Sequence, residues 1–142
     1  LTMFLALNAS VELYKGGVVP LAEYAQRPYD RDILVRVLVP KENARFVYQS
    51  VRNSQTDFPV LTCAAAKLAD GSIRAAIGAR PGKAVLYTAA PEAGETAEEF
   101  AARFAAEVKA GIKTESNLRG GAEYRRHLAG VLTKRAVGRL EG

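Results

Sequence analysis

The hydrophobic residues follow a strand-like order in the middle of the chain and a helix-like order towards its end. β-Branched and aliphatic residues fill 33–39 apart from Arg36, and this run stops at Pro40, which has no amide hydrogen to donate to a sheet. Further strands are predicted at 45–51, 60–68, 73–79 and 84–88. Because these segments follow one another closely, we expect them to form an antiparallel meander.

Two short patterns add detail to this meander. Asp70-Gly71 stands between two strand-like runs, and both residue types tolerate the positive φ of a tight hairpin turn. The run Cys63-Ala64-Ala65-Ala66 interrupts the alternation with small side chains. We therefore predict a hairpin at 70–71 and a helix that packs closely against the strand carrying the small residues.

Two helices are predicted after the strands, at about 96–110 and 121–139. Thr96 and Glu99 have the spacing of a capping box, which marks the start of the first helix. Apolar residues recur at helical spacing in both segments. They are Ala97, Phe100, Ala101, Phe104, Ala105 and Val108 in the first, and Tyr124, Leu128, Val131, Leu132 and Ala136 in the second. Strands followed by helices predict an α+β fold: an antiparallel sheet of three to four strands with both helices on one face.

Residues 1–27 carry weaker signals. The pattern predicts the last turn of a helix at Leu5 and Leu7, and a strand at 11–14, where apolar and polar residues alternate. A turn is predicted at Gly16-Gly17 and a short helix at 21–24. This is too little for a domain. Since the chain also begins with Leu1, we expect it to be a fragment or a processed product.

Composition excludes several classes of protein. The 142 residues include 49% hydrophobic and 25% charged residues, which is ordinary for a soluble globular domain, and the net charge is +5. With one cysteine and one histidine, the chain has neither an internal disulfide framework nor a Cys- or His-rich metal site. No apolar stretch is long enough to span a membrane, and the N-terminus is a poor signal peptide. We expect a cytoplasmic protein.

Four candidates for site chemistry each have a plain structural explanation. Cys63 lies in a strand, where a buried and inert thiol is the usual case. His127 is interpreted as a solvated or interface residue, because no partner for catalysis is evident. The run 78–83 resembles a phosphate loop only faintly, since Lys83 is followed by Ala84 and a strand. The basic cluster of Arg125, Arg126, Lys134, Arg135 and Arg139 indicates a solvated helix face or a subunit contact rather than a nucleic-acid reader.

One segment is far more specific. Residues 117–136 read NLRGGAEYRRHLAGVLTKRA, which closely resembles the end of the FAD-binding medium subunits of the molybdenum hydroxylases, the xanthine dehydrogenase and carbon monoxide dehydrogenase family. That family's pattern is Asp-x-Arg-Gly-Ser-Ala-Glu-Tyr-Arg. This chain departs from it at two positions, with Asn117 where the family has Asp and Gly121 where it has Ser. The resemblance extends to 46–66 and 71–84, and more weakly to 5–14 and 19–21.

The resemblance implies two parts and an electron-transfer role. Residues 1–41 would be the tail of the FAD-binding domain, and 42–142 a domain like the C-terminal domain of CO dehydrogenase flavoprotein. In such enzymes a large subunit carries the molybdenum cofactor and a small subunit carries the iron–sulfur clusters. FAD takes the electrons and passes them to NAD or another acceptor. We expect these two subunits as partners, no nucleic acid, and a possible homodimer of the complex.

The same resemblance suggests which residues meet the flavin. Asp57, Phe58 and Pro59 would form a loop that approaches the isoalloxazine ring, and Arg74 would stabilise the anionic reduced flavin. For Asp57 a turn-initiating role, and for Arg74 an ordinary outward position on a strand, remain open. Because the family's Gly-rich pyrophosphate loops lie upstream, this chain alone is not expected to retain FAD.

The alternative hypothesis has no cofactor role: an α+β module that docks other subunits or an anionic partner. For the second helix we expect Arg125, Arg126, Lys134 and Arg139 to be solvated or to meet an acidic surface. Arg119, just before the helix, is expected instead to fix the adjoining loop by bonding to carbonyls or a carboxylate.

Overall fold

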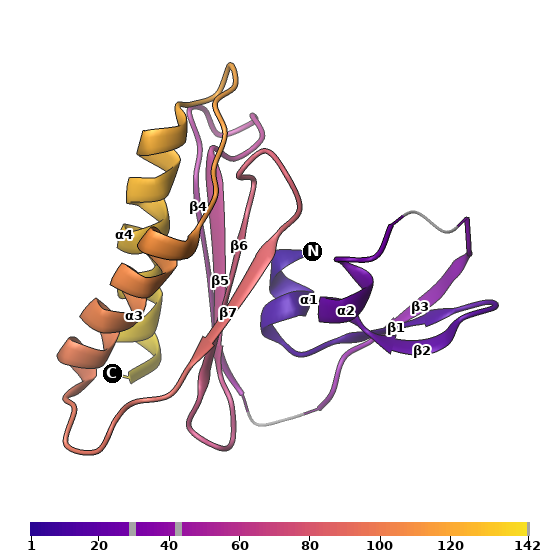
Figure 1. Ribbon diagram of the computed structural model, residues 1–142, viewed down its shortest axis with the longest axis horizontal. Coiled ribbons are helices and arrows are strands. Elements are labelled where there is room, and N and C mark those ends of the chain that lie inside the picture. Colours follow the sequence, from indigo (N-terminus) through magenta and orange to yellow (C-terminus); the bar gives the residue numbers. More distant parts are fainter. Residues whose placement is uncertain (29–30, 42–43, 142) are drawn as a thin grey trace.

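A computed structural model describes residues 1–28, 31–41 and 44–141. Within them the chain forms two antiparallel sheets, one of four strands in the order β4-β5-β6-β7 and one of three strands in the order β2-β1-β3. Figure 1 shows two long helices as an outer layer on one face of the larger sheet, with the N-terminal segment on its other side. None of the described helices is long and apolar enough to cross a membrane.

The larger sheet is the predicted meander. Its strands are β4 (Arg45–Val51), β5 (Leu61–Lys67), β6 (Ile73–Gly78) and β7 (Val85–Ala89). Each pairs antiparallel with the next, and Gly71, at φ +83°, takes the left-handed conformation that the hairpin between β5 and β6 requires. The predicted sheet of three to four strands and the predicted hairpin are both confirmed.

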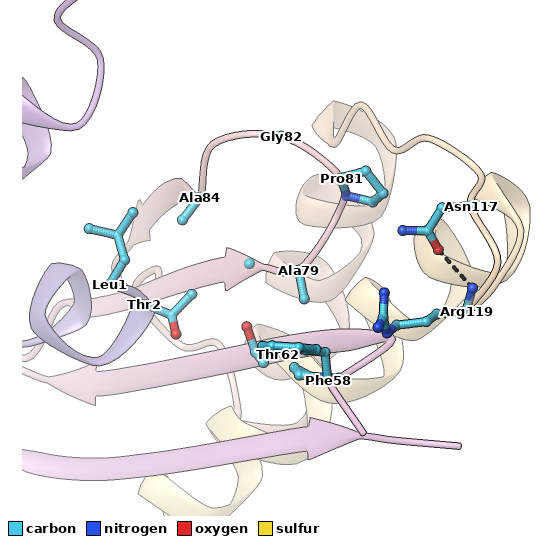
Figure 2. A pocket seen from close by; sticks show the side chains of 12 residues that line it. Leu1, Thr2, Phe58, Thr62, Ala79, Pro81, Gly82, Ala84, Asn117 and Arg119 are labelled. Carbon is cyan, nitrogen blue, oxygen red and sulfur yellow. Dashed lines mark hydrogen bonds between the residues drawn. The ribbon is translucent and has the colours of Figure 1, made fainter. Parts of the chain in front are cut away.

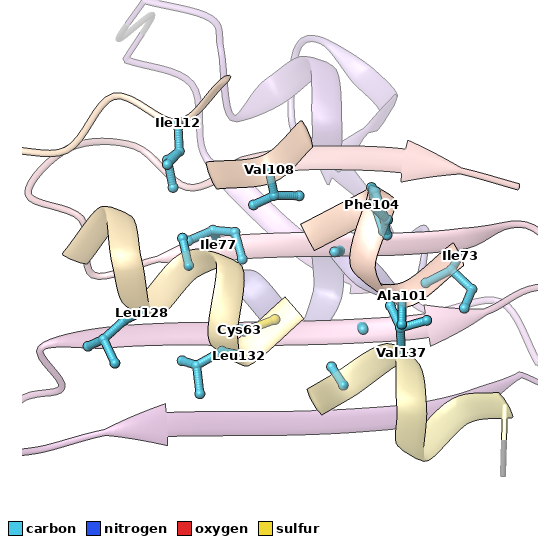
Figure 3. Close-up of a cluster of buried hydrophobic side chains, with 14 of the residues drawn as sticks. Cys63, Ile73, Ile77, Ala101, Phe104, Val108, Ile112, Leu128, Leu132 and Val137 are labelled. Carbon is cyan, nitrogen blue, oxygen red and sulfur yellow. The ribbon is translucent and has the colours of Figure 1, made fainter. Parts of the chain in front are cut away.

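Helices α3 (Ala97–Gly111) and α4 (Ala122–Glu141) cover the same face of this sheet, as predicted. Thr96 caps α3 in a full capping box: its side chain accepts from the amide of Glu99, whose carboxylate accepts from the amide of Thr96. The core beneath the helices is drawn in Figure 3, where Phe104, Val108, Leu132 and Val137 lie over Cys63 and Ile77 of the sheet. Burial of this apolar surface is the main stabilising contribution here.

The buried stripe of α4 differs from the prediction by one position. Tyr124 was expected in the core, but it is 50% exposed, and Arg125 is fully buried instead. Of the other predicted members, Leu128, Leu132 and Ala136 are buried, whereas Val131 is only partly buried. The reason is that the first turn of α4 passes over loops rather than over the sheet. The guanidinium of a long arginine side chain can donate to several carbonyl groups there at once, whereas a tyrosine has a single O–H donor.

The N-terminal part forms the smaller sheet. It comprises α1 (Thr2–Ala6), β1 (Ser10–Leu13), β2 (Gly17–Pro20), α2 (Leu21–Tyr24) and β3 (Leu34–Leu38). The expectation that the run 33–39 opens the meander is wrong, because β3 pairs with β1 and not with β4. The Arg36 side chain bonds to Glu12 of β1 at 2.5 Å, and Pro40 separates β3 from β4. The predicted domain boundary after residue 41 lies outside the described residues.

The two parts meet on the second face of the larger sheet, where α1 packs against small residues of β5 and β6. Ala64, Ala66 and Ala76 are fully buried in a cluster that includes Leu5 and Ala6 of α1. Cys63 and Ala65 point to the opposite face and lie in the core beneath α3 and α4. The small side chains of β5 thus admit a helix closely, as predicted, and they do so on both faces.

Candidate functional site

A pocket of about 440 Å³ lies at one end of the larger sheet, where three loops and the start of α1 converge. Figure 2 shows the loop after β4, the turn after β6 and the segment before α4 around it. Its lining comprises Leu1, Thr2, Phe58, Pro59, Thr62, Gly78, Ala79, Pro81, Gly82, Ala84, Asn117 and Arg119. A mostly apolar hollow with a few polar groups is the usual form of a small-molecule site.

The loop after β4 brings Phe58 to the mouth of this pocket. The Asp57 carboxylate accepts from the amide of Phe58 at 2.7 Å, and the Arg52 guanidinium bonds to the carbonyl oxygen of Asp57. These bonds fix the loop, while the Phe58 ring itself is 73% exposed. The ring is therefore accessible to a ligand that enters the pocket.

Arg119 joins this loop to the segment before α4. Its Nε lies 3.0 Å from Oδ1 of Asp57, and its guanidinium carbon lies 5.2 Å from the centre of the Phe58 ring. Asn53 closes the same junction by donating from Nδ2 to the carbonyl oxygen of Arg119 at 3.0 Å. The hydrogen bond from Arg119, with that from the Phe58 amide, holds the pKa of the Asp57 carboxyl below its usual range. The expected loop-fixing role of Arg119 is confirmed.

Arg125 holds both loops from inside. Its Nε donates to the carbonyl oxygen of Val60 at 2.9 Å, and its Nη1 donates to the carbonyl oxygens of Glu115 at 2.6 Å and Gly120 at 2.5 Å. Burial, together with the nearby charge of Arg119, lowers the pKa of this guanidinium. The expectation that Arg125 is solvated is therefore wrong, because unpaired loop carbonyls offer it more acceptors than an outward position would.

Asn117 completes the set of acceptors. Its Oδ1 accepts from Nη2 of Arg125 at 2.5 Å and from the amide of Arg119 at 2.9 Å, a bond drawn in Figure 2. Among the described residues, the hydrogen bonds of the Arg125 guanidinium thus all go to neutral oxygens. A buried arginine is usually paired with a carboxylate, so the positive charge at this edge of the pocket is only partly balanced, by Asp57 next to Arg119.

Arg74, Cys63 and His127 lie apart from the pocket lining. Arg74 is on β6, on the same face of the strand as Gly78 and four residues away, which corresponds to about 13 Å. Its predicted contact with a flavin stays a prediction. Cys63 is fully buried, and burial raises the pKa of its thiol to about 12, in agreement with an inert role. His127 is exposed on α4, and 78–83 is a turn between strands, as expected.

Sequence reasoning missed two parts of this site: the turn 79–82, dismissed as a mere connection, and Arg125. A signal for Arg125 was present, since positions 125, 129, 132 and 136 fit a helical stripe as well as the set that begins at Tyr124. The partners of its guanidinium are backbone carbonyls far apart in the chain, and these leave no mark in the sequence.

The arrangement suits binding of a flat ring better than acid–base or nucleophilic chemistry. An exposed aromatic face, proline and alanine surfaces, and donors and acceptors on Thr62, Asn117 and Arg119 can meet a ring that is apolar on its faces and polar at its edge. Among the described residues no group of three or more His, Cys, Asp and Glu could hold a metal ion. A flavin ring therefore fits the kind of residues present.

Comparisons with known proteins show which solved structures share this fold. Quinoline 2-oxidoreductase from Pseudomonas putida 86 is similar in structure, with a TM-score of 0.74 and 20% identity over 99% of this chain and 55% of that one. Carbon monoxide dehydrogenase from Hydrogenophaga pseudoflava gives a TM-score of 0.76 and 23% identity over 98% of this chain and 54% of that one. The chain thus spans about half the length of these relatives, and at such identities the likeness shows the fold. No curated protein sequence matches.

The family model for the CO dehydrogenase flavoprotein C-terminal domain matches residues 46–140, which is more than half of the chain. Apart from the first residue of β4 and the last residue of α4, this range contains the larger sheet, both long helices and the two loops that Arg125 joins. The chain belongs to the family of CO dehydrogenase flavoprotein C-terminal domains.

Proposed function

We propose that this chain is the C-terminal portion of the FAD-binding subunit of a molybdenum-containing hydroxylase or dehydrogenase, and that its pocket receives the isoalloxazine ring. In this proposal residues 1–41 belong to the FAD-binding domain, and 42–142 form the C-terminal domain. The observation that carries the proposal is that the loop 57–59 and the family's most specific segment meet at one pocket, joined by Arg119.

Each loop residue then has a defined task. Phe58 offers its exposed ring for stacking, and Pro59 lines the pocket next to it. Asp57 holds Arg119 in place over the ring of Phe58. Arg119 and Arg125 add positive charge at the pocket edge, and Arg74 adds charge on the same face of β6. Positive charge near a flavin favours its anionic reduced form.

When bound, FAD would supply the redox chemistry, while this chain orients the ring and sets its electrostatic environment. In the proposed complex the electrons come from iron–sulfur clusters of a small subunit, which receive them from a molybdenum centre on a large subunit. NAD or another acceptor takes them up. The CO dehydrogenase and quinoline 2-oxidoreductase of the comparison are oxidoreductases, which supports this class of reaction.

The test uses the 142-residue chain and FMN as the probe of ring binding. We expect FMN at millimolar concentration to shift the amide NMR signals of 57–62, 78–82 and 117–119, since these segments surround the pocket. Phe58→Ala is expected to weaken this binding at least about fivefold, the equivalent of ~1 kcal/mol of stacking. Arg74→Met, measured alongside, shows whether Arg74 takes part.

Phe46→Ala is the matched control, because Phe46 is also a partly exposed phenylalanine but lies on the edge strand β4 away from the pocket. An equal loss in both variants, or signal shifts only outside the pocket, would contradict the proposal and favour a docking module without a cofactor role. FAD is not expected to remain on the chain through purification, since its anchoring groups lie on Gly-rich loops of the kind expected upstream.

A further inference from the structure

The outer surface of the two-helix layer carries a groove between α3 and α4 that the flavin proposal does not use. Two neighbouring hollows follow this groove and share Ala106 and Lys109. Small residues form its floor and cations form its rim. The floor residues are Ala105, Ala106, Ala110, Gly111, Ile112, Gly130 and Val131, and the rim residues are the cations Lys109, Lys113, Arg126 and Lys134, together with His127.

The cations of the rim are free to meet a partner. Within the part of the chain that the structure describes, Lys109, Arg126 and Lys134 take part in no ion pair. Neither hollow is lined by an aspartate or a glutamate. The carboxylates of α3 that do form ion pairs or caps lie on other parts of the helix, where Glu107 pairs with Arg103 and Glu99 completes the cap.

The helices approach closely at the centre of the groove, which sets the spacing of the cations. A Cβ atom on Gly130 would lie 3.3 Å from Cβ of Lys109, so Lys109 stands level with Gly130. Arg126 and Lys134 are four residues before and after Gly130, or about 6 Å to either side along the helix axis. Measured along the helix axis, the three cations therefore follow one another at intervals of roughly 6 Å, with Lys109 on α3 and the other two on α4.

We propose that this groove binds an acidic helical segment of a partner protein. A helix with carboxylates at positions i, i+4 and i+8 repeats the same spacing of about 6 Å. Alanine or other small residues between the carboxylates would pack against the alanine and glycine floor. Opposite charges in complementary rows give an interface its specificity and speed its formation.

The floor distinguishes this partner from other polyanions. A nucleic-acid backbone has no apolar side chains to cover the alanine floor, and the lining residues of the groove include no Phe, Tyr or Trp ring on which bases could stack. A lipid surface calls for large apolar side chains that insert, whereas the floor contains only alanine, glycine and one valine besides Ile112.

The test measures how tightly a labelled synthetic peptide binds to the 142-residue chain. The peptide is a helix of glutamate and alanine, with glutamates at every fourth position. Ala106→Gln fills the floor without changing charge, and we expect it to weaken binding about tenfold. Ala102→Gln is the matched control, because Ala102 is exposed on the same helix but lines neither hollow. It is expected to bind like the unaltered chain.

Charge is tested separately with Lys109→Glu/Lys134→Glu against Lys41→Glu/Arg45→Glu, which changes net charge equally outside the groove. The groove variant is expected to lose binding at least about tenfold more than its control at 0.15 M salt, where distant charges are screened.

Equal losses in the two charge variants, or equal losses in the two alanine variants, would overturn the proposal. So would tighter binding of a single-stranded DNA 20-mer, or of anionic phosphatidylserine vesicles, that depends on the same lysines. Thermal melting of each variant shows that it is folded, and an unfolded pair is replaced by Lys109→Gln/Lys134→Gln and its matched control.

Discussion

In the larger sheet, residues 61–66 of β5 are all buried, whereas all five residues of β3 in the smaller sheet are exposed. Strand β5 lies between two other strands and has a helix on each face, while β3 is an edge strand. The β3 side chains are nevertheless valine and leucine apart from Arg36. The comparison teaches that position in the fold decides burial here: the small residues of β5 lie between two layers of a closed core, whereas the larger apolar residues of β3 stay exposed.

The largest expected effect falls on the region that closes its own core. Arg125→Met removes the donors that hold Val60, Glu115, Gly120 and Asn117, and we expect the free energy of unfolding to fall by about 3 kcal/mol. Urea unfolding followed by circular dichroism measures this change. Arg126→Met, one residue on and exposed, is the control and should cost less than about 0.5 kcal/mol. Similar losses in the two variants would show that the buried network contributes little.

Hydrogen exchange compares the two sheets directly. The amides of β5 should exchange only through global unfolding, and those of β3 at least about a hundredfold faster, because an exposed edge strand opens locally. Mass spectrometry of peptides from 61–67 and 34–38 gives the two rates. Equal protection would mean that the smaller sheet is as cooperative as the larger one.

Arg119→Ala is expected to have a smaller effect than Arg125→Met. We expect it to lower the free energy of unfolding by about 1 kcal/mol, because the Arg119–Asp57 pair is about one-third exposed. The melting temperature should fall clearly. Arg139→Ala, on the exposed side of α4, should leave it almost unchanged. If the two substitutions had equal effects, the loop junction at Arg119 would not contribute to stability.

Asn117→Asp should act in the opposite direction. A carboxylate keeps both hydrogen bonds that Asn117 Oδ1 now accepts and places a negative charge next to Arg125. Because residue 117 is itself exposed, the new charge loses little hydration, and we expect a gain of about 0.5–1 kcal/mol. A loss of stability in urea unfolding would show that the neutral acceptors already satisfy the guanidinium.

The smallest expected effect is on the pH dependence of the loop 52–59. The pKa of Asp57 is lowered in the folded chain. The stabilisation that the ionised carboxylate gives the folded chain is therefore fully present above the ordinary pKa of 3.8, and it is lost as the pH falls through the lower pKa of the folded chain. The amide signal of Phe58 should therefore titrate with a midpoint below 3.8 in NMR spectra. In Arg119→Ala this midpoint should rise towards 3.8, and an unchanged midpoint would exclude Arg119 as the main cause.

The features that the sequence predicted well depend on neighbours in the chain. The Thr96–Glu99 cap and the hairpin at Gly71 are local, and the meander follows from short connections. The partner of β3 and the environment of Arg125 depend on segments far apart in the chain. Apolar periodicity favours Tyr124 over Arg125 as a core residue, because it ranks side chains by hydrophobicity and ignores the loop carbonyls that a guanidinium can reach.

The contact between α1 and the larger sheet has a consequence for how freely this sequence can vary. A Cβ atom on Gly78 would lie 2.5 Å from Cγ2 of Thr2, and Ala64, Ala66 and Ala76 lie fully buried on the same side. A library of all single substitutions should therefore tolerate changes at these four positions less well than at the larger side chains of β3. On this face of the protein, the residues with the least side chain are the hardest to replace.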